Sequence, residues 1–309
     1  MQARRWGVYD VRMVPVLHSV SYAGVWPGQA RLALEEFLDK AAALGFPGVM
    51  LMAKRPHLSV LDYPAEACRR LREKLEAKGL RCYVIAGYNN FTADLEHGDI
   101  PHREMQIQHI TELARMAEIL GAAVVRVFTS YEHPAIGYAR LFEMNVECLR
   151  ECARRAADCG VTIGVQNHHD FACDHRTLVD LVDAVGEPNC RPIFDAWSPA
   201  LHGTDYVAAA RELAPRICHT TAADYQLRPR FRYHPELINY TQETPWVQAV
   251  PMGEGFIDYK GFFRALREGG YDGPVGYEMC APLLSGGSVE NLDRAARRFL
   301  TFLEEAGAS

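Results

Sequence analysis

The sequence predicts an α/β fold, a (β/α)8 TIM barrel formed by one domain. Short apolar runs of strand length alternate with longer segments of helical period along the 309 residues. Alternation of this kind is typical of a parallel sheet with right-handed crossovers. Eight such units follow one another, which predicts that the sheet closes into a barrel. An open doubly wound sheet is the competing interpretation, but no G-x-G-x-x-G motif follows the first strand.

The strands are expected at eight apolar runs that are bounded by polar or turn residues. The stretch from 161 to 203 organises the chain, because it contains two of these runs and each of them ends in polar residues. In order, the runs are VRMVPVLHSV (11–20), GVMLM (48–52), LRCYVIAG (80–87), AAVVRVFTS (122–130), VTIGVQ (161–166), PIF (192–194), RICHTT (216–221) and GPVGYEM (273–279).

The segments between these runs carry apolar residues at helical spacing. In residues 29–44, for example, Leu34, Phe37, Leu38 and Ala41 fall on one side. Glycine after such a segment is typical of a helix end, because it adopts the left-handed conformation at little cost. Helices are expected at 29–44, 64–78, 102–120, 136–159, 205–213, 256–270 and 291–307, with a further one between the fifth and sixth strands, and Gly45, Gly79, Gly121 and Gly160 follow the first four.

The composition limits the classes of partner. The net charge is -6 and the pI is about 6.1, so neither nucleic acid nor an anionic membrane is expected to bind, since their phosphates attract basic surfaces. The nine cysteines form no C-x-x-C pair, which favours free thiols in a reducing compartment. No signal peptide and no apolar run of about 20 residues is found. A cytoplasmic location is therefore expected.

One stretch interrupts the alternation. Residues 224–256 show no clear periodicity and are rich in aromatic residues and arginine, which disfavours disorder. The stretch leaves the seventh strand at the end of the barrel where an active site is expected, and loops of this length are often functional. It is interpreted as an insert that forms a lid over the substrate. A contact between copies of the chain, in a homo-oligomer, is the alternative.

Polar side chains stand at the ends of four consecutive strands, namely Gln166, Asp195, His219 and Glu278. Consecutive strands of a barrel are neighbours, so these side chains are expected to converge. Carboxylates together with an imidazole suit Mn²⁺, Mg²⁺, Co²⁺ or Zn²⁺. Each residue alone is more often a helix cap or a satisfied core group. Their equivalent positions on successive strands favour a site for one divalent metal ion.

Four motifs lie in the second half of the chain: VQNHHD (165–170), PIFDAWSPALHG (192–203), ICHTTAAD (217–224) and MGEGFIDYKGFFRALREGGYDGPVGYE (252–278). Together they resemble the sugar phosphate isomerase/epimerase superfamily of xylose isomerase-like TIM barrels, which includes ketose 3-epimerases, inosose dehydratases and endonuclease IV. The last motif is the most specific, because it joins Gly-Glu-Gly, a helix, Gly-Tyr-Asp-Gly and a strand that ends in Glu. The resemblance covers nearly the whole chain and indicates the superfamily more strongly than a substrate.

In the epimerases that the chain resembles, Glu, Asp, His and Glu bind one divalent ion, and the two Glu residues also shuttle protons. The resemblance thus implies a metal site, in which Asp195 and Glu278 match the family pattern. Gln166 replaces the first Glu, and its amide oxygen can ligate a metal but cannot accept a proton at neutral pH. His219 matches the first His of the His-x-His motif, whereas Thr221 replaces the second.

These departures weigh against epimerisation by two Glu residues. The candidate catalytic residues are Glu278 and His168, because a neutral imidazole is the usual general base near pH 7. The pair His168-His169 also resembles the His-rich loop of inosose dehydratases, in which proton abstraction leads to loss of water. The structural alternative is that His168 holds Gln166 or Asp195 in place.

Further polar residues at strand ends are candidates for binding the hydroxyl or carboxylate groups of a substrate. They are His18, Lys54, His57, Asn89, Arg126, His169 and Glu254. For Glu254, which lies in the Gly-Glu-Gly turn, ordering of the insert is the alternative role.

The observations predict a divalent-metal-dependent enzyme that removes a proton α to the carbonyl of a keto sugar or sugar derivative, in the manner of a sugar isomerase or epimerase. The first alternative is a dehydratase or lyase that expels a β-substituent from a keto-cyclitol or an oxidised (3-keto) glycoside. The second alternative is a non-catalytic barrel that acts as the partner subunit of an active paralogue. An enzyme like endonuclease IV would need three metal ions and a basic face, which the net charge of -6 disfavours.

Overall fold

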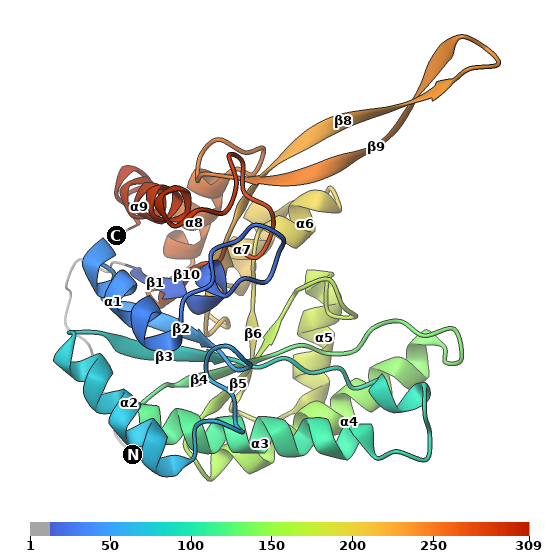
Figure 1. Cartoon of the computed structure of the whole chain (residues 1–309). Helices are drawn as coiled ribbons and strands as arrows, with labels where there is room; N and C mark the ends of the chain where they lie inside the picture. Colours follow the sequence, from blue (N-terminus) through green and yellow to red (C-terminus); the bar gives the residue numbers. More distant parts are fainter. Residues whose placement is uncertain (1–12, 309) are drawn as a thin grey trace.

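Eight parallel strands form the barrel of the computed structural model, which describes residues 13–308 (Figure 1). The strand order is β6-β5-β4-β3-β2-β1-β10-β7. Between the two outer strands the amide of Cys218 donates to the carbonyl oxygen of Pro192 (3.0 Å), and Ile193 forms a parallel bridge with His219. These contacts nearly close the sheet, so the predicted (β/α)8 barrel is confirmed.

The barrel strands are short and mostly buried, and each overlaps one of the predicted apolar runs. They are β1 (Val14–His18), β2 (Gly48–Met52), β3 (Arg81–Ala86), β4 (Val124–Val127), β5 (Thr162–Gln166), β6 (Cys190–Ile193), β7 (Thr220–Ala222) and β10 (Pro274–Tyr277). The apolar residues divide into two main sets. A small cluster includes Val16, Met50, Val84 and Ile193, and a much larger one includes side chains of the strands and of the helices.

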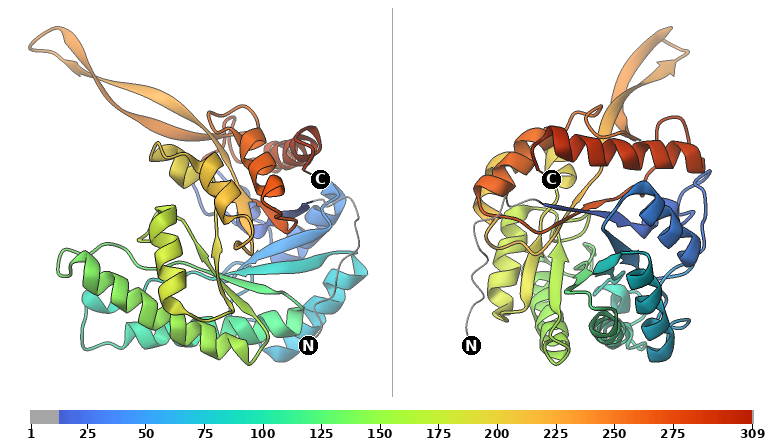
Figure 2. Two further views of the ribbon diagram at one scale, coloured as in Figure 1. Left: turned by 180° about the vertical axis from the view of Figure 1, so that it is seen from behind. Right: turned by 90° about the vertical axis from the view of Figure 1, so that its left-hand side faces the viewer.

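Helices cover the outside of the barrel (Figures 1 and 2). They are α1 (Leu34–Leu44), α2 (Ala65–Ala77), α3 (His102–Leu120), α4 (Tyr138–Ala157), α5 (His175–Val185), α6 (Trp197–Leu201), α7 (Tyr206–Leu213), α8 (Tyr259–Glu268) and α9 (Val289–Glu305), with 3-10 turns η1 (Ser19–Tyr22) and η2 (Ala93–Leu95). As expected, Gly45 and Gly121 end α1 and α3 in the left-handed conformation. Within residues 13–308 no helix is both long enough and apolar enough to span a bilayer.

The first helix begins later than predicted. α1 starts at Leu34, whereas the apolar spacing suggested a start near Gln29. Gln29 is buried, and its side-chain amide donates to three backbone carbonyl oxygens, those of Val20, Ser21 and Met279, at 3.0–3.1 Å. These bonds tie the chain before α1 to the residues after β1 and β10. Residues 29–33, which precede α1, therefore form an irregular segment.

The insert is an antiparallel hairpin, in which β8 (Asp224–His234) pairs with β9 (Asn239–Val250). Most of its length projects away from the barrel (Figures 1 and 2). Its base is fixed by Asp224, whose Oδ2 accepts hydrogen bonds from the amides of Gly253 and Gly255, both at 2.9 Å. A Cβ at Gly255 would lie 1.8 Å from Asp224 Oδ1. The Gly-Glu-Gly motif therefore allows the chain to wrap around this carboxylate.

Candidate active site

The carboxylate of Asp195 is the centre of a buried hydrogen-bond network at the carboxyl ends of β5, β6 and β7. Its Oδ2 accepts from Thr221 Oγ1 (2.7 Å) and from the amide nitrogen of Gln166. Its Oδ1 accepts from the backbone amide of Thr221 (2.5 Å). The structure thus brings Gln166 and Asp195 into direct contact, and Thr221 completes the network.

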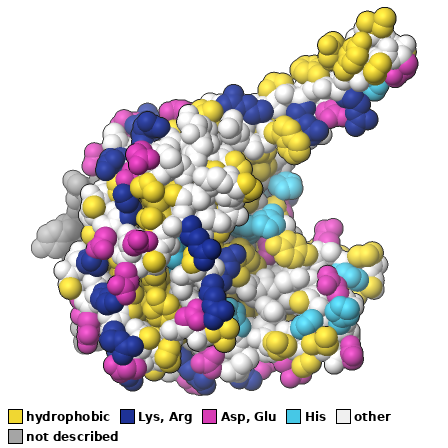
Figure 3. All heavy atoms as spheres, in the orientation of Figure 1, with side chains coloured by type: hydrophobic (Ala, Val, Ile, Leu, Met, Phe, Trp, Pro, Cys, Tyr) yellow, Lys and Arg dark blue, Asp and Glu magenta, His cyan; other side chains and the backbone are white. Residues whose placement is uncertain are grey.

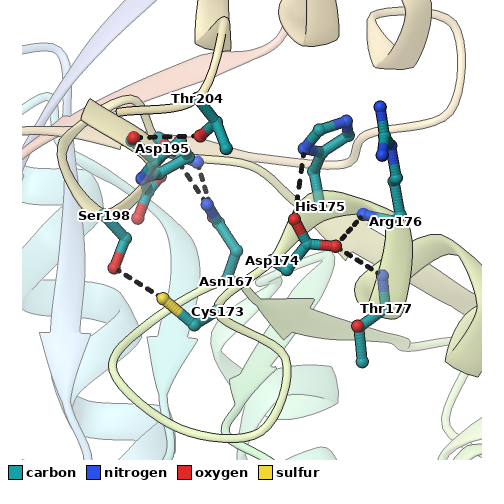
Figure 4. A network of polar contacts seen from close by, with 10 residues as sticks. Asn167, Cys173, Asp174, His175, Arg176, Thr177, Asp195, Ser198 and Thr204 are labelled. Atoms are coloured by element: carbon teal, nitrogen blue, oxygen red, sulfur yellow. Dashed lines mark hydrogen bonds and ion pairs between the residues drawn. The ribbon is translucent and has the colours of Figure 1, made fainter. Parts of the chain in front are cut away.

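The main chain of Asp195 is held by the side chain of Asn167 (Figure 4). The amide of Asp195 donates to Asn167 Oδ1 (2.7 Å), and Asn167 Nδ2 donates to the carbonyl oxygen of Asp195 (3.0 Å). In the next turn Ser198 Oγ donates to the carbonyl oxygen of His168 (2.6 Å). These bonds join the loops after β5 and β6. They fix the position of the Asp195 carboxylate.

Burial is the main influence on the titration of Asp195. It raises the pKa of the carboxyl group, and the hydrogen bonds from Thr221 and Gln166 oppose this rise. The donors therefore replace part of the hydration that the carboxylate loses inside the barrel.

His219 directly precedes β7, forms the parallel bridge with Ile193 of β6 and is wholly buried. A Cβ at Gly276 of β10 would lie 3.2 Å from His219 Nε2, so the imidazole packs against that glycine. Burial, together with the charge of Arg126, lowers the pKa of His219 to about 3. His219 is therefore a neutral group. Within the described part of the chain, no hydrogen bond links it to Asp195 or Gln166.

Arg126, in β4, is the buried cation of the site. Its side chain is 1% exposed. The guanidinium carbon lies 4.1 Å from the centre of the Phe128 ring and 4.8 Å from that of Tyr88. Nε and Nη1 are buried and have no hydrogen-bond partner within residues 13–308. Aromatic faces stabilise a cation but accept no strong hydrogen bond. Two donors are thus left for the oxygen atoms of a ligand.

The charge of Arg126 acts on the other candidate residues. It contributes to the lowered pKa of four imidazoles and opposes the raised pKa of two carboxyl groups; these residues are His18, His168, His169, His219, Asp195 and Glu278. An interaction with so many groups requires proximity to all of them. Arg126 is therefore at the electrostatic centre of the predicted site.

Glu278 follows β10 directly and is 7% exposed. Burial raises the pKa of its carboxyl group, Arg126 opposes this rise, and Asp195 adds to it. Oε2 is buried and has no hydrogen-bond partner within the described residues. Although Arg126 acts on its titration, the described side chains form no ion pair between the two. Glu278 and Arg126 are therefore a base and a cation that influence each other's charge without an ion pair between them.

His168 lies in an aromatic wall. Its ring centre is 4.5 Å from that of Phe128, 5.1 Å from that of Trp197 and 3.9 Å from that of His169. Burial, with smaller contributions from His169 and Arg126, lowers the pKa of His168 to about 2. The imidazole is therefore neutral at physiological pH and a weak base. This environment favours a hydrogen-bonding role for His168.

The next two residues of the same loop have different surroundings. His169 is exposed, and its Nε2 lies 2.9 Å from the hydroxyl of Tyr131. Asp170 is buried, and its Oδ2 accepts from Thr129 Oγ1 (2.8 Å) and from the Thr129 amide (2.5 Å). Asp170 thus ties this loop to the end of β4. His169 remains open to a ligand at the rim.

Two further candidates lie near Arg126. The Lys54 ammonium is 4.0 Å from the centre of the Tyr88 ring that Arg126 also contacts, and burial lowers its pKa. His18 is wholly buried at the end of β1. Its Nδ1 accepts from the amide of Val20 (3.3 Å), and its Nε2 has no partner within residues 13–308. We therefore group Lys54 and His18 with Arg126 as candidates for binding substrate.

The three remaining candidates make structural contacts. His57 Nε2 lies 3.1 Å from the carbonyl oxygen of Leu32. The Asn89 amide bridges the main chain of Phe128 with bonds of 2.8 and 2.9 Å. The side chain of Glu254 is exposed, and the backbone carbonyl oxygen of Glu254 accepts from Gln226 Nε2 (2.7 Å). Their predicted roles in substrate binding stay predictions.

The residues present do not fit the implied divalent ion. Within residues 13–308, no three His, Cys, Asp or Glu side chains are grouped so that they could hold a metal. Gln166 and Thr221 explain the misfit, because both donate hydrogen bonds to Asp195. The amide nitrogen of Gln166 has no lone pair for a metal, and the Asp195 oxygens face these donors, whereas Gln166 Oε1, His219 Nε2 and Glu278 Oε2 are buried without a hydrogen-bond partner among residues 13–308. As arranged in this structure the four side chains are not grouped around one point, and the ligand set of Gln166, Asp195, His219 and Glu278 stays a prediction.

We expect the double substitution Gln166→Glu/Thr221→His to create metal binding that the wild type lacks. It removes the two side-chain donors to Asp195 Oδ2, leaves the backbone amide of residue 221 on Oδ1, and supplies a second carboxylate and an imidazole, which are ordinary ligands of Mn²⁺, Co²⁺ and Zn²⁺. After dialysis against each metal, elemental analysis should find roughly one ion per chain in the double variant and far less in the wild type. Adding Asp195→Asn should abolish the gain. Stoichiometric metal in the wild type, lost in Asp195→Asn, would instead support the original ligand set.

A family model described as xylose isomerase-like TIM barrel matches residues 38–305. The chain belongs to this family. The superfamily resemblance inferred from the four motifs is therefore confirmed. Among curated proteins, none matches the chain in sequence.

Several solved structures are similar to the chain at low sequence identity. The probable 3-DHS dehydratase AsbF of Bacillus anthracis, involved in petrobactin synthesis, has a TM-score of 0.70 at 18% identity and covers 94% of this chain and 99% of its own. D-psicose 3-epimerase of Clostridium cellulolyticum H10, solved with D-tagatose, has 0.71 at 18%, covering 96% and 100%. The IolI protein, solved with a zinc atom, has 0.73 at 14%, covering 96% and 98%. At these identities the likeness shows the fold alone.

Proposed function

We propose that the chain is an enzyme that removes the proton α to the carbonyl of a keto sugar or sugar derivative. Arg126 would hold the carbonyl oxygen, and Glu278 would be the base. The observation that carries this proposal is the buried guanidinium of Arg126, whose Nε and Nη1 have no acceptor within residues 13–308. The names of the similar structures, an epimerase and a probable dehydratase, support this class of chemistry.

The proton transfer follows from the two side chains. The Glu278 carboxylate accepts the α-proton, and the electron pair of the broken C–H bond forms an enolate. The enolate oxygen then accepts hydrogen bonds from Arg126, which are stronger to an oxyanion than to a ketone. Burial raises the pKa of Glu278, which makes its carboxylate a better base than an exposed one.

The fate of the enolate favours elimination. Inversion at carbon needs a second acid on the opposite face of the substrate, and the sequence has Gln166 where the family pattern has a second Glu. Elimination needs only that a β-substituent leaves with its electron pair, while protonated Glu278 can return its proton to that group. The neutral imidazole of His168 is suited to hydrogen bond the same group. A dehydratase or lyase acting on a keto-cyclitol or 3-keto glycoside is therefore our preferred form of the function.

Other residues of the site would bind the substrate. Lys54 and His18, which lie near Arg126, are suited to hydroxyl groups next to the carbonyl, and His169 is suited to the outer end of the substrate. A divalent ion has no step in this scheme.

Deuterium exchange tests the proposal. In D₂O the wild type is expected to exchange the α-proton of a ketohexose, a keto-cyclitol or a 3-keto glycoside, and to release the β-substituent where one is present, as followed by proton NMR. Glu73→Gln, which alters an exposed carboxylate of α2, is the control and should act like the wild type. If no probe exchanges although some of them bind, the chain is a binding protein, and the proposal is wrong.

A further inference from the structure

The hairpin of residues 224–250, here called the arm, has two different faces. Opposite residues of an antiparallel pair lie on the same face. The register pairs Leu227 with Val247, Phe231 with Gln242 and Tyr233 with Tyr240 on one face, and Arg228 with Trp246, Arg230 with Glu243 and Arg232 with Thr241 on the other. We call the face that carries Leu227, Phe231 and Tyr233 the apolar face, because none of the residues in its pairs is charged.

The charged face is satisfied within the arm. Glu243 accepts from Arg230 (2.9 Å) and from Arg232 (2.8 Å). The Arg230 guanidinium also lies 4.1 Å from the centre of the Trp246 ring. Arg228, Arg230 and Arg232 stand against the single carboxylate of Glu243, so this face keeps a net positive charge that water can solvate. This face needs no partner.

The apolar face is open to solvent. Phe231 is 62% exposed and Tyr240 is 63% exposed, and at the tip Ile238 is 82% exposed. The arm contains eight of the sixteen exposed large apolar side chains found within residues 13–308. Figure 3 shows hydrophobic side chains gathered towards its tip. A sheet with one apolar face is stable when that face is covered by another layer, and a two-stranded hairpin is marginal in water without such a layer.

We propose that the apolar face of the arm is covered by the same face of a second copy of this chain, so that the protein is a two-fold symmetric dimer joined by its arms. A two-fold contact needs a surface that is complementary to itself. A face of Leu, Val, Phe and Tyr residues without charge meets this condition. The other exposed large apolar side chains are scattered over separate helices and loops, such as Met105, Tyr138 and Leu201. Met105 and Tyr138 each line a surface pocket with a few other apolar residues, so docking of an arm on the partner's barrel is the alternative that the mixing experiment separates.

The area of the face suits a dimer. At about 200 Å² per aromatic side chain, the exposed fractions of Phe231, Tyr233 and Tyr240 correspond to roughly 350 Å². The aliphatic residues of the arm bring the total towards the ~800 Å² that each partner gives to an interface of standard size. Exposed apolar patches of this size are rare on monomers. The inference does not rest on the proposed enzymatic function.

Light scattering of the full chain after size exclusion tests the dimer. The wild type is expected at twice the chain mass of 34.7 kDa. Phe231→Glu, on the apolar face, should give the monomer mass with an unchanged circular dichroism spectrum. The matched control is Thr241→Glu, which should stay dimeric. Thr241 lies on the charged face, on the other strand and diagonal to Phe231. A monomeric wild type, or a dimer that persists in Phe231→Glu, would overturn the proposal.

A mixing experiment separates pairing of the two arms from docking of an arm on the partner's barrel. Phe231→Glu and Phe231→Lys should each be monomeric. If the apolar faces meet near Phe231, an equimolar mixture should recover the dimer mass, because opposite charges then face each other. This recovery should disappear at high salt. If both variants are monomeric and the mixture stays so, pairing of the arms is ruled out.

Discussion

Replacing Arg126 by Met is expected to lower kcat/KM for α-proton removal by roughly 10²–10³-fold, the loss that follows removal of an oxyanion-binding donor. Methionine has a similar length and tolerates the aromatic contacts with Phe128 and Tyr88, so the barrel should remain folded. Arg126→Lys keeps the charge but loses the planar fork of donors. It should recover only part of the activity.

The pH profile distinguishes this role from a structural one. Arg126 opposes the rise in the pKa of Glu278, so its removal raises that pKa further. Since the carboxylate is the active form, the acid limb of kcat/KM should move to higher pH in Arg126→Met. Arg211→Met, which alters an exposed ion pair with Glu268, should leave both the rate and the profile unchanged. Wild-type rates in Arg126→Met would refute the assigned role.

Glu278→Gln is expected to lower kcat for deuterium exchange by about 10²–10⁴-fold, the usual contribution of a positioned general base. The amide has the same shape but cannot take up a proton, so KM should change little. In the wild type, kcat/KM should fall as the pH drops through the pKa of Glu278, which burial places above the ordinary value. The acid limb should therefore lie above ~4.3, the pKa of an exposed Glu.

Stopped-flow binding of a keto sugar gives the control for this second substitution. If Glu278→Gln binds the probe as the wild type does but does not exchange its proton, Glu278 acts in the chemical step. Glu278→Asp, which shortens the side chain by one methylene, should recover a fraction of the rate. Exchange at the wild-type rate in Glu278→Gln would move the role of base to another residue.

The sequence predicted the barrel because each strand and helix has a regular local pattern. It did not predict the arm, because its apolar residues belong to alternate positions of two strands that pair across a register shift near Arg228 and Arg230. The pattern becomes visible only when the two strands are aligned. Gln29 shows a similar limit, since its three hydrogen bonds join residues that are distant in sequence.

The site was predicted less completely, because its contacts also join residues that are distant in sequence. The strand-end positions of Gln166, Asp195 and Glu278 follow from the order of strands, and all three are buried at the carboxyl ends as expected. The sequence treated Thr221 as a missing ligand, whereas the structure shows it as a donor to Asp195. Asn167 was overlooked, although its place next to Gln166 was a usable signal. The unpaired donors of Arg126 are seen only once burial is known.

The bonds that Gln166 and Thr221 make to Asp195 also affect how this site can change during evolution. A Glu at 166 alone would place two carboxylates against each other, and a His at 221 alone would remove the donor hydroxyl from Asp195. Each single change leaves buried polar groups unsatisfied, at a cost of about 1–3 kcal/mol, whereas both together supply a metal-binding set. The two positions are therefore epistatic. We expect one type of site to evolve into the other only in a protein whose free energy of unfolding is large enough to tolerate the destabilised single-substitution variant.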